Sequence, residues 1–166
     1  MKKALFFAMI GIYSLGFANS SSRNMKFSDF LNKIISAYEN GFESVKALST
    51  TTNVRSNYYI DDDLMKSKIS PEGAEESFFD DFTDSYVYYA YFGQSKNYTV
   101  DLSPKYVLMK TYIQAYMKAN GDFRKIKSDD MSTVYKSSYC EVELNIYENS
   151  NLGTGIYCLS FSVDNF

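Results

Sequence analysis

The stretch SYVYYAYF at residues 85–92, followed by PKYVLMKTYIQAYMKAN at residues 104–120, decides the fold that this sequence predicts. The first run has almost no polar alternation, and its aromatic and β-branched residues favour a strand packed on both faces. The second run begins with Pro104, which the first turn of a helix tolerates because its missing N–H would have no partner there. A strand followed by a helix is therefore expected at the centre of the core.

The expected helix at 104–120 has signals at both ends. Ser103 can serve as its N-cap and Gly121 as a left-handed C-cap. Apolar side chains recur along it at spacings of three and four residues, which predicts that they form one stripe facing the core. The stripe consists of Val107, Leu108, Tyr112, Ala115, Tyr116 and Ala119.

The strongest helical periodicity lies earlier, over residues 27–48, with Ser28 as the expected N-cap. Gly41 falls inside this helix at a cost of about 1 kcal/mol relative to Ala, which predicts a kink or a close approach by a neighbouring element. The apolar face is Phe27, Phe30, Leu31, Ile34, Ile35, Tyr38, Phe42, Val45 and Leu48. The expected solvated face is Asn32, Lys33, Ser36, Glu39 and Glu43.

The remaining elements are strands. Residues 58–60 can form a short strand, residues 133–148 a long one and residues 156–163 the last, with a charged connection at 122–131 and a turn at 149–155. In the long strand Cys140, Val142, Leu144 and Ile146 are expected to face the core, with Tyr139, Glu141, Glu143 and Asn145 on the other side. This order predicts a single small α+β domain, with an antiparallel sheet of about four or five strands and two main helices packed on one face.

The N-terminus has the pattern of a cleaved secretory signal peptide, over residues 1–18. Lys2 and Lys3 precede an uncharged apolar run, and Gly16 and Ala18 are the small residues expected before a cleavage site. The apolar run is shorter than the roughly 20 residues of a membrane span, so no stable membrane insertion is expected after cleavage. The expected organisation is a mobile lead-in at 19–24, one domain at 25–166, and a periplasmic or extracellular location.

The charge of the chain is unevenly distributed. The net charge is −3, and loss of Lys2 and Lys3 with the signal leaves 15 basic residues against 20 acidic ones, or −5. Residues 61–84 alone carry −7, so the rest of the exported chain is +2. An acidic chain without a basic stripe is a poor ligand for phosphate backbones, so we expect no nucleic acid partner.

The composition also limits the possible chemistry. The chain has no His, which excludes Ser-His-Asp and Cys-His nucleophile systems and His-ligated zinc. The run from Asp61 to Asp63 offers oxygen ligands but lacks the alternating acidic spacing and the Gly of a calcium-binding loop. We therefore expect no catalytic residues, no metal and no cofactor, with a carboxylate-dependent hydrolase as the alternative.

Two cysteines, Cys140 and Cys158, are an even number in a chain expected to be exported, which favours a disulfide. A turn centred near residues 151 and 152 would place Cys158 opposite Asn145, too far from Cys140 to bond. A direct bond requires a tighter turn near Asn149. We expect the disulfide from the compartment more than from the geometry.

These observations predict a non-catalytic protein-binding module, such as an inhibitor or immunity-type protein that binds a basic envelope or extracellular protein. Its surface would be acidic and rich in Tyr, because charge complementarity speeds encounter and fixes register. The expected binding residues are Tyr58, Tyr59, Asp61, Asp62, Asp63, Glu75, Glu76, Asp80 and Asp81. A self-associating envelope or surface component is a further alternative, and the oligomeric state is left open.

Overall fold

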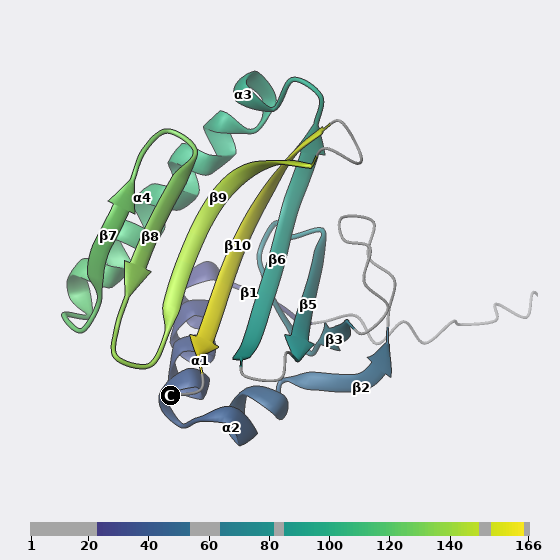
Figure 1. Cartoon of the computed structure of the whole chain (residues 1–166), viewed down its shortest axis with the longest axis vertical. Coiled ribbons are helices and arrows are strands. Elements are labelled where there is room, and N and C mark those ends of the chain that lie inside the picture. The colour runs from purple at the N-terminus through teal and green to yellow at the C-terminus, as the bar shows by residue number, and fades with distance from the viewer. Residues whose placement is uncertain (1–22, 54–63, 82–84, 150–153, 165–166) are drawn as a thin grey trace, which may run out of the picture.

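An eight-stranded antiparallel sheet forms the centre of the fold, with the two longer helices on one of its faces (Figure 1). The structure is a computed structural model that describes residues 23–53, 64–81, 85–149 and 154–164. In sheet order the strands are β2 (Ser49–Asn53), β3 (Met65–Ser67), β5 (Glu76–Asp81), β6 (Ser85–Ser95), β10 (Thr154–Asp164), β9 (Glu141–Asn149), β8 (Ser132–Lys136) and β7 (Arg124–Ser128). The expected α+β class, antiparallel sheet and one-sided helices are confirmed.

A separate parallel pair, β1 (Arg23–Met25) and β4 (Ile69–Pro71), joins the start of the described chain to the region before β5. Arg23 and Asn24, which were expected in a mobile lead-in, therefore belong to a strand. The expected signal peptide lies outside the described residues. Within the described part of the chain, no helix is long and apolar enough to cross a membrane.

The sheet has more strands than the expected four or five, for three reasons. The charged connection after the second long helix pairs with β8 and forms the exposed edge strand β7. The expected long strand at 133–148 is divided into β8 and β9 by a turn in which the Ser137 amide donates to the Cys140 carbonyl at 2.9 Å. The described part of the acidic segment adds β3 and β5 to the sheet, while its third strand, β4, pairs with β1.

The first helical region is interrupted where glycine was expected to disturb it. Helix α1 (Phe27–Glu39) ends before Gly41, and the short helix α2 (Phe42–Lys46) follows. Gly41 has a φ of 86°, which L side chains rarely adopt, and a Cβ there would meet nothing within 4 Å. The kink is confirmed, without a close approach at this residue. Lys26, not Ser28, occupies the N-cap position of α1, without a side-chain cap bond.

The second helical region was assigned to the wrong face. Helix α3 (Tyr98–Asp101) leads into α4 (Ser103–Ala119), which buries Tyr106, Ile113 and Met117 against the sheet. Five of the six residues of the stripe expected in the core are exposed: Val107 is 59%, Leu108 57% and Tyr112 53% exposed, and Ala115 and Ala119 are exposed as well. Tyr116, the sixth, is half-buried and packs against the core. The physical reason is that α4 carries apolar residues on more than one side, so periodicity alone could not choose between two stripes.

The expected caps of α4 are also wrong. Ser103 lies in the first turn, and its hydroxyl donates to the carbonyl of Thr99, four residues earlier, at 2.5 Å. It therefore makes no N-cap hydrogen bond to the amides of α4. At the other end Asn120 is extended, and its side-chain amide donates to the Tyr116 carbonyl at 2.9 Å. Gly121 does not have a positive φ.

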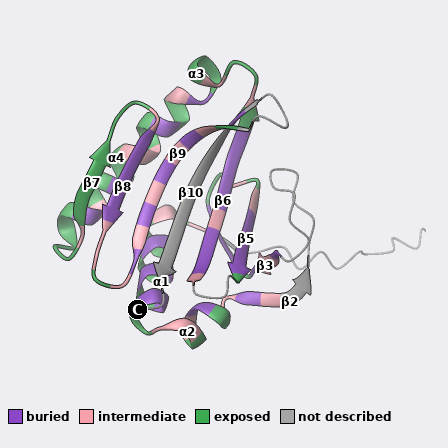
Figure 2. Cartoon of the chain, in the orientation of Figure 1, coloured by how far each residue is buried: buried purple, intermediate pink, exposed green. Residues whose placement is uncertain are grey.

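Both faces of β6 are packed, as its composition predicts, and Figure 2 shows the strand as mostly buried. On the helix side, Tyr86, Tyr88, Ala90 and Phe92 belong to the main core. On the other side, Tyr91 packs with Leu64 and Phe78 in a smaller cluster. The edge strand β7 is exposed throughout.

The hairpin of β9 and β10 decides the cysteine pairing. Asn149 pairs with Thr154, and Cys158 lies opposite Asn145 on β9. The turn is therefore the wider of the two considered, and Asn145 lies five positions along the chain from Cys140. Cys140 is a buried free thiol, so the expected disulfide is not formed. Cys140, Val142, Leu144 and Ile146 are all buried, as predicted.

Candidate functional site

The acidic surface expected from the sequence is only partly described. Tyr58, Tyr59, Asp61, Asp62 and Asp63 lie outside the described residues. Four of the expected binding residues, on or next to β5, can be placed.

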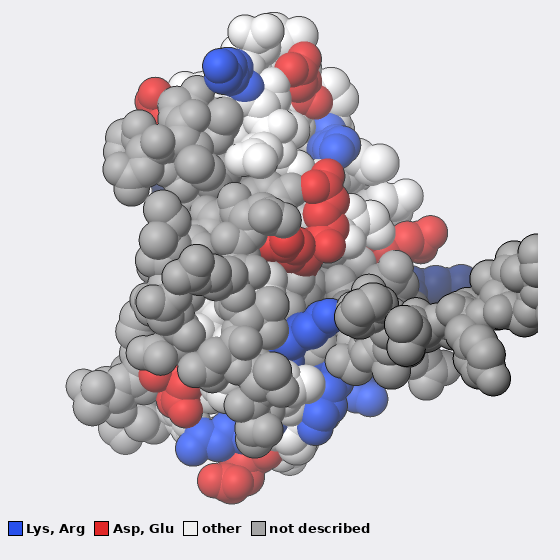
Figure 3. All heavy atoms as spheres, turned by 90° about the vertical axis from the view of Figure 1, so that its right-hand side faces the viewer, with Lys and Arg blue, Asp and Glu red and all other residues white. Residues whose placement is uncertain are grey.

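These four do not form one exposed patch. Glu75 and Asp81 are exposed, Glu76 is half-buried, and Asp80 is buried at 4% exposure. Side chains alternate along a strand, so Asp80 and Asp81 also point to opposite faces of the sheet. Figure 3, which views the molecule from the side of β3 and β5, shows acidic and basic side chains interspersed among the described atoms. The described part of the segment therefore lacks the single-sign surface that was expected.

A concave surface lies between α1 and α4, and we call it the apolar groove. Its volume is about 640 Å³. The first two turns of α1 form one wall, and the exposed stripe of α4 forms the other. Its apolar lining residues are Phe27, Leu31, Leu108, Met109, Tyr112 and Ala115. Lys26 and Glu72 supply one charge of each sign at its margin, so the groove is close to neutral.

Residues that line this groove make two contacts between the helices. The rings of Phe27 and Tyr112 lie 6.2 Å apart and tilted, and the Tyr116 hydroxyl donates to Asn32 Oδ1 at 2.7 Å. Burial, with the nearby carboxylate of Glu39, raises the pKa of Tyr116, so its hydroxyl stays protonated and available as a donor. The two helices are thus linked through Tyr112 and Tyr116, both of which line the groove.

A second, smaller groove continues along the same two helices, and we call it the acidic groove. Its volume is about 220 Å³, it shares Tyr116 with the apolar groove, and it contains the carboxylates of Glu39 and Asp122. The Tyr139 hydroxyl donates to Glu39 Oε1 at 2.7 Å, and burial followed by this carboxylate raises the pKa of Tyr139 strongly. The residues that line this groove include no Lys or Arg.

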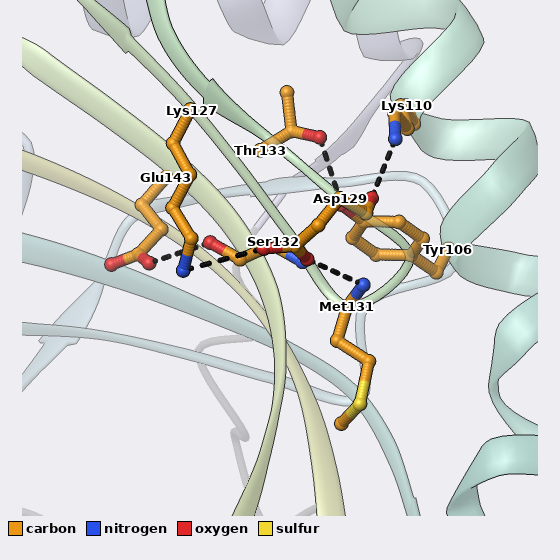
Figure 4. Close-up of polar contacts among 8 residues, drawn as sticks. All are labelled: Tyr106, Lys110, Lys127, Asp129, Met131, Ser132, Thr133 and Glu143. Atoms are coloured by element: carbon orange, nitrogen blue, oxygen red, sulfur yellow. Dashed lines mark hydrogen bonds and ion pairs between the residues drawn. The ribbon is translucent and has the colours of Figure 1, made fainter.

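A third group of polar side chains, drawn in Figure 4, holds α4 against the turn between β7 and β8. The Asp129 carbonyl accepts hydrogen bonds from the Tyr106 hydroxyl at 3.3 Å and from Lys110 Nζ at 2.7 Å. Its carboxylate accepts from the backbone amides of Met131 at 2.8 Å and Ser132 at 2.6 Å, which lower the pKa of Asp129. This arrangement fixes the turn and explains why Tyr106 is a buried residue of α4.

In the same region two carboxylates bond to one residue, Ser132. Ser132 donates from its amide to Asp129 and from its hydroxyl to Glu143 Oε1 at 3.2 Å. A general acid needs a raised pKa, whereas that of Asp129 is lowered, so this carboxylate is ionised at neutral pH. Neither groove between α1 and α4 is lined by Asp129 or Glu143. The pair therefore has the features of a structural contact.

Metal-binding side chains do not gather in the described ranges: no group of three or more Cys, Asp or Glu residues there could hold an ion. Leu108 and Tyr112 are the main residues of the apolar groove. The sequence pattern identified both, but it assigned them to the core. The sequence did show that their stripe has a rival, because Tyr106, Ile113 and Met117 form a second stripe at spacings of seven and four residues, but it does not say which of the two faces the core. One helix cannot turn both stripes toward the same sheet.

No family model, no curated protein and no solved structure matches this chain.

Proposed function

We propose that this chain is an exported, non-catalytic module that binds a protein partner through the apolar groove and the exposed face of α4. The observation that carries the proposal is the exposure of Val107, Leu108 and Tyr112 on one side of a helix, next to a groove about 640 Å³ in volume. Single exposed apolar residues are ordinary, but a contiguous set beside a concavity is typical of an interaction surface.

The surface has the composition of a binding site for a protein segment. Leu108 and Tyr112 form a wall from a regular helix, so their positions do not depend on ordering a loop. Burying one large apolar side chain contributes about 1.5–3 kcal/mol, and Tyr adds a hydroxyl for orientation. Binding a helix in a groove between helices is a common mode of peptide recognition.

The exposed edge strand β7 is a poorer candidate for partner binding. Arg124, Lys125 and Lys127 are exposed along it, and charged side chains on an edge strand oppose the addition of another strand. Its one large exposed apolar residue, Ile126, is 49% exposed and stands among these charges. Ile126 is therefore a useful control position.

Export and the basic partner remain predictions from the sequence. Export rests on residues 1–18, and intact-mass measurement of protein recovered from envelope or medium tests it, with Asn19 expected as the first residue. The basic partner was predicted for the acidic segment; of the expected binding residues that the structure describes there, Glu75 and Asp81 are exposed. The proposed surface on α4 does not depend on that segment.

Site-specific photo-crosslinking tests the proposal. A photoreactive phenylalanine analogue is placed at Leu108 in one variant and at Ile126 in another, and both are expressed in the native host. Since both positions are exposed, both variants should fold. A discrete crosslinked protein from position 108 that is absent from position 126 is expected. Equal products from both positions, or none from position 108, would overturn the proposed surface.

A further inference from the structure

We infer that the partner segment is an amphipathic helix that puts apolar side chains into the apolar groove and one basic side chain into the acidic groove. This inference rests on the proposed function and deepens it by stating the chemistry and spacing of what binds. It follows from three observations: the order of the two grooves, their charges and the distance between them.

The two grooves lie one after the other along the same pair of helices. On α1 the apolar groove is lined by Phe27 and Leu31, and the acidic groove continues with Asn32 and Glu39. On α4 both grooves share Tyr116. A segment laid between the helices would therefore pass from one groove into the other without changing direction.

The charges of the two grooves differ. The apolar groove has Lys26 and Glu72 at its margin, whereas the acidic groove contains Glu39 and Asp122 and no basic lining residue. Lys118 stands nearby on the last turn of α4 but does not line the acidic groove. Tyr139 donates to Glu39 but carries no positive charge, so a basic side chain from a partner would supply the missing complement.

The helix geometry sets the spacing that the partner must have. From Leu108 and Tyr112 in the apolar groove, α4 continues to Ala119 and is followed directly by Asn120, which lines the acidic groove. At 1.5 Å per residue this separation is about 12–18 Å. A helical partner has the same rise, so its basic residue should lie about 8–12 positions from its first apolar anchor.

A second copy of this chain is a weaker candidate for the occupant. Helix α4 carries Lys105, Lys110 and Lys118 and no acidic residue. Lys110 donates to the Asp129 carbonyl on the Tyr106 side of the helix, so antiparallel packing of two copies of α4 through their exposed faces would involve Lys105 and Lys118, which find no carboxylate on the facing α4, and this costs affinity. The acidic groove would also receive no new cation in that arrangement, because Lys118 would lie at the opposite end of the interface.

A displayed library of 16-residue helical segments with randomised faces tests the inference. Segments are selected on the exported chain and then measured on variants by fluorescence anisotropy. Leu108→Glu reports on the apolar groove, and the double variant Glu39→Gln with Asp122→Asn reports on the acidic groove. Glu43→Gln is the matched control, because Glu43 is exposed on α2 and lines neither groove.

Selected segments should lose binding on Leu108→Glu and carry Lys or Arg 8–12 positions from their first apolar anchor. Replacing that basic residue by Gln should weaken binding about three- to fivefold on the wild-type chain, the range for partly exposed charge pairs, and on Glu43→Gln as well. On the double variant the same replacement should have no effect.

The other possible outcomes would overturn the inference alone or the inference together with the proposed function. Segments that need Leu108 but show no basic preference would overturn this inference and leave the proposed function standing. A set of segments indifferent to Leu108→Glu would overturn both. A chain that is dimeric at micromolar concentration and monomeric as Leu108→Glu would assign the apolar groove to a second copy, which also overturns the inference.

Discussion

Shortening one apolar side chain on each side of α4 measures which face of this helix stabilises the fold. Ile113 is 1% exposed in the main core, so Ile113→Ala removes buried methyl groups and leaves a cavity. Such changes cost about 2–5 kcal/mol, less a few tenths because Ala favours the helix. Leu108 is 57% exposed, so its truncation can remove less than half of the roughly 1.5–3 kcal/mol that full burial of a Leu side chain contributes to stability. Leu108→Ala should therefore cost about 1 kcal/mol or less.

Thermal unfolding followed by circular dichroism separates these two costs. For a domain of this size, 1 kcal/mol lowers Tm by about 2–4 °C. Ile113→Ala should therefore lower Tm by roughly 5–15 °C and Leu108→Ala by less than about 4 °C. Urea unfolding should rank the variants in the same order with unchanged m-values. A larger loss for Leu108→Ala would refute the assignment of faces, and with it the exposed stripe on which the proposed function rests.

Three further outcomes are expected. Gly155→Ala would place a Cβ inside the ring of Tyr98 and should cost on the order of 3 kcal/mol, whereas Gly121→Ala meets nothing and should leave Tm nearly unchanged; equal effects would contradict the packing of α3 on β10. Backbone amides lower the pKa of Asp129 below its ordinary 3.8, so its contribution to stability is complete above that value and is lost as the pH falls through the folded-state pKa. Urea midpoints between pH 5 and pH 2 should therefore fall further for the wild type than for Asp129→Asn, and parallel curves would exclude this role. Burial raises the pKa of the Cys140 thiol, so maleimide should modify Cys140 only after unfolding, and rapid labelling of the folded chain, located by peptide mass, would contradict its burial.

Several elements of the fold could be predicted because local signals for them are strong and agree. The aromatic run of β6, the apolar face of α1 and the alternation of β9 all specify both an element and its orientation. Gly41 likewise marked the end of α1, since a positive φ is available to glycine at little cost. In these places the local pattern agrees with the tertiary structure, and most of the residues expected to be buried are buried; on α1 the exception is Phe27, which is half-buried.

The orientation of α4 could not be predicted, because it is decided by a contact distant in sequence. Tyr106 bonds to Thr133 at 2.8 Å and to the Asp129 carbonyl, which turns its side of the helix toward the sheet. Nothing within residues 104–120 encodes that choice. The candidate site was missed for the same reason, since Leu108 and Tyr112 are functional candidates only once the other stripe is known to be buried.

The number of strands escaped prediction for a different reason. Strand β7 consists of exposed and mostly charged residues, so it lacks the apolar alternation that identifies a half-buried strand. It forms because β8 offers unpaired backbone groups beside it. Edge strands are in general held by backbone hydrogen bonds more than by their side chains, and composition is a poor guide to them.

The position of β10 has a consequence for when this chain can fold. β10 is the last strand in chain order, yet it lies in the middle of the sheet, between β6 and β9. Its pairing joins Ser85 with Asp164 and Ser95 with Gly155, so the two halves of the sheet stay apart until β10 arrives. Contacts between residues so distant in sequence form slowly. A chain that emerges from a ribosome or a membrane channel N-terminus first would therefore remain open until residues 154–164 are released, and during that interval it could still be threaded through a narrow pore.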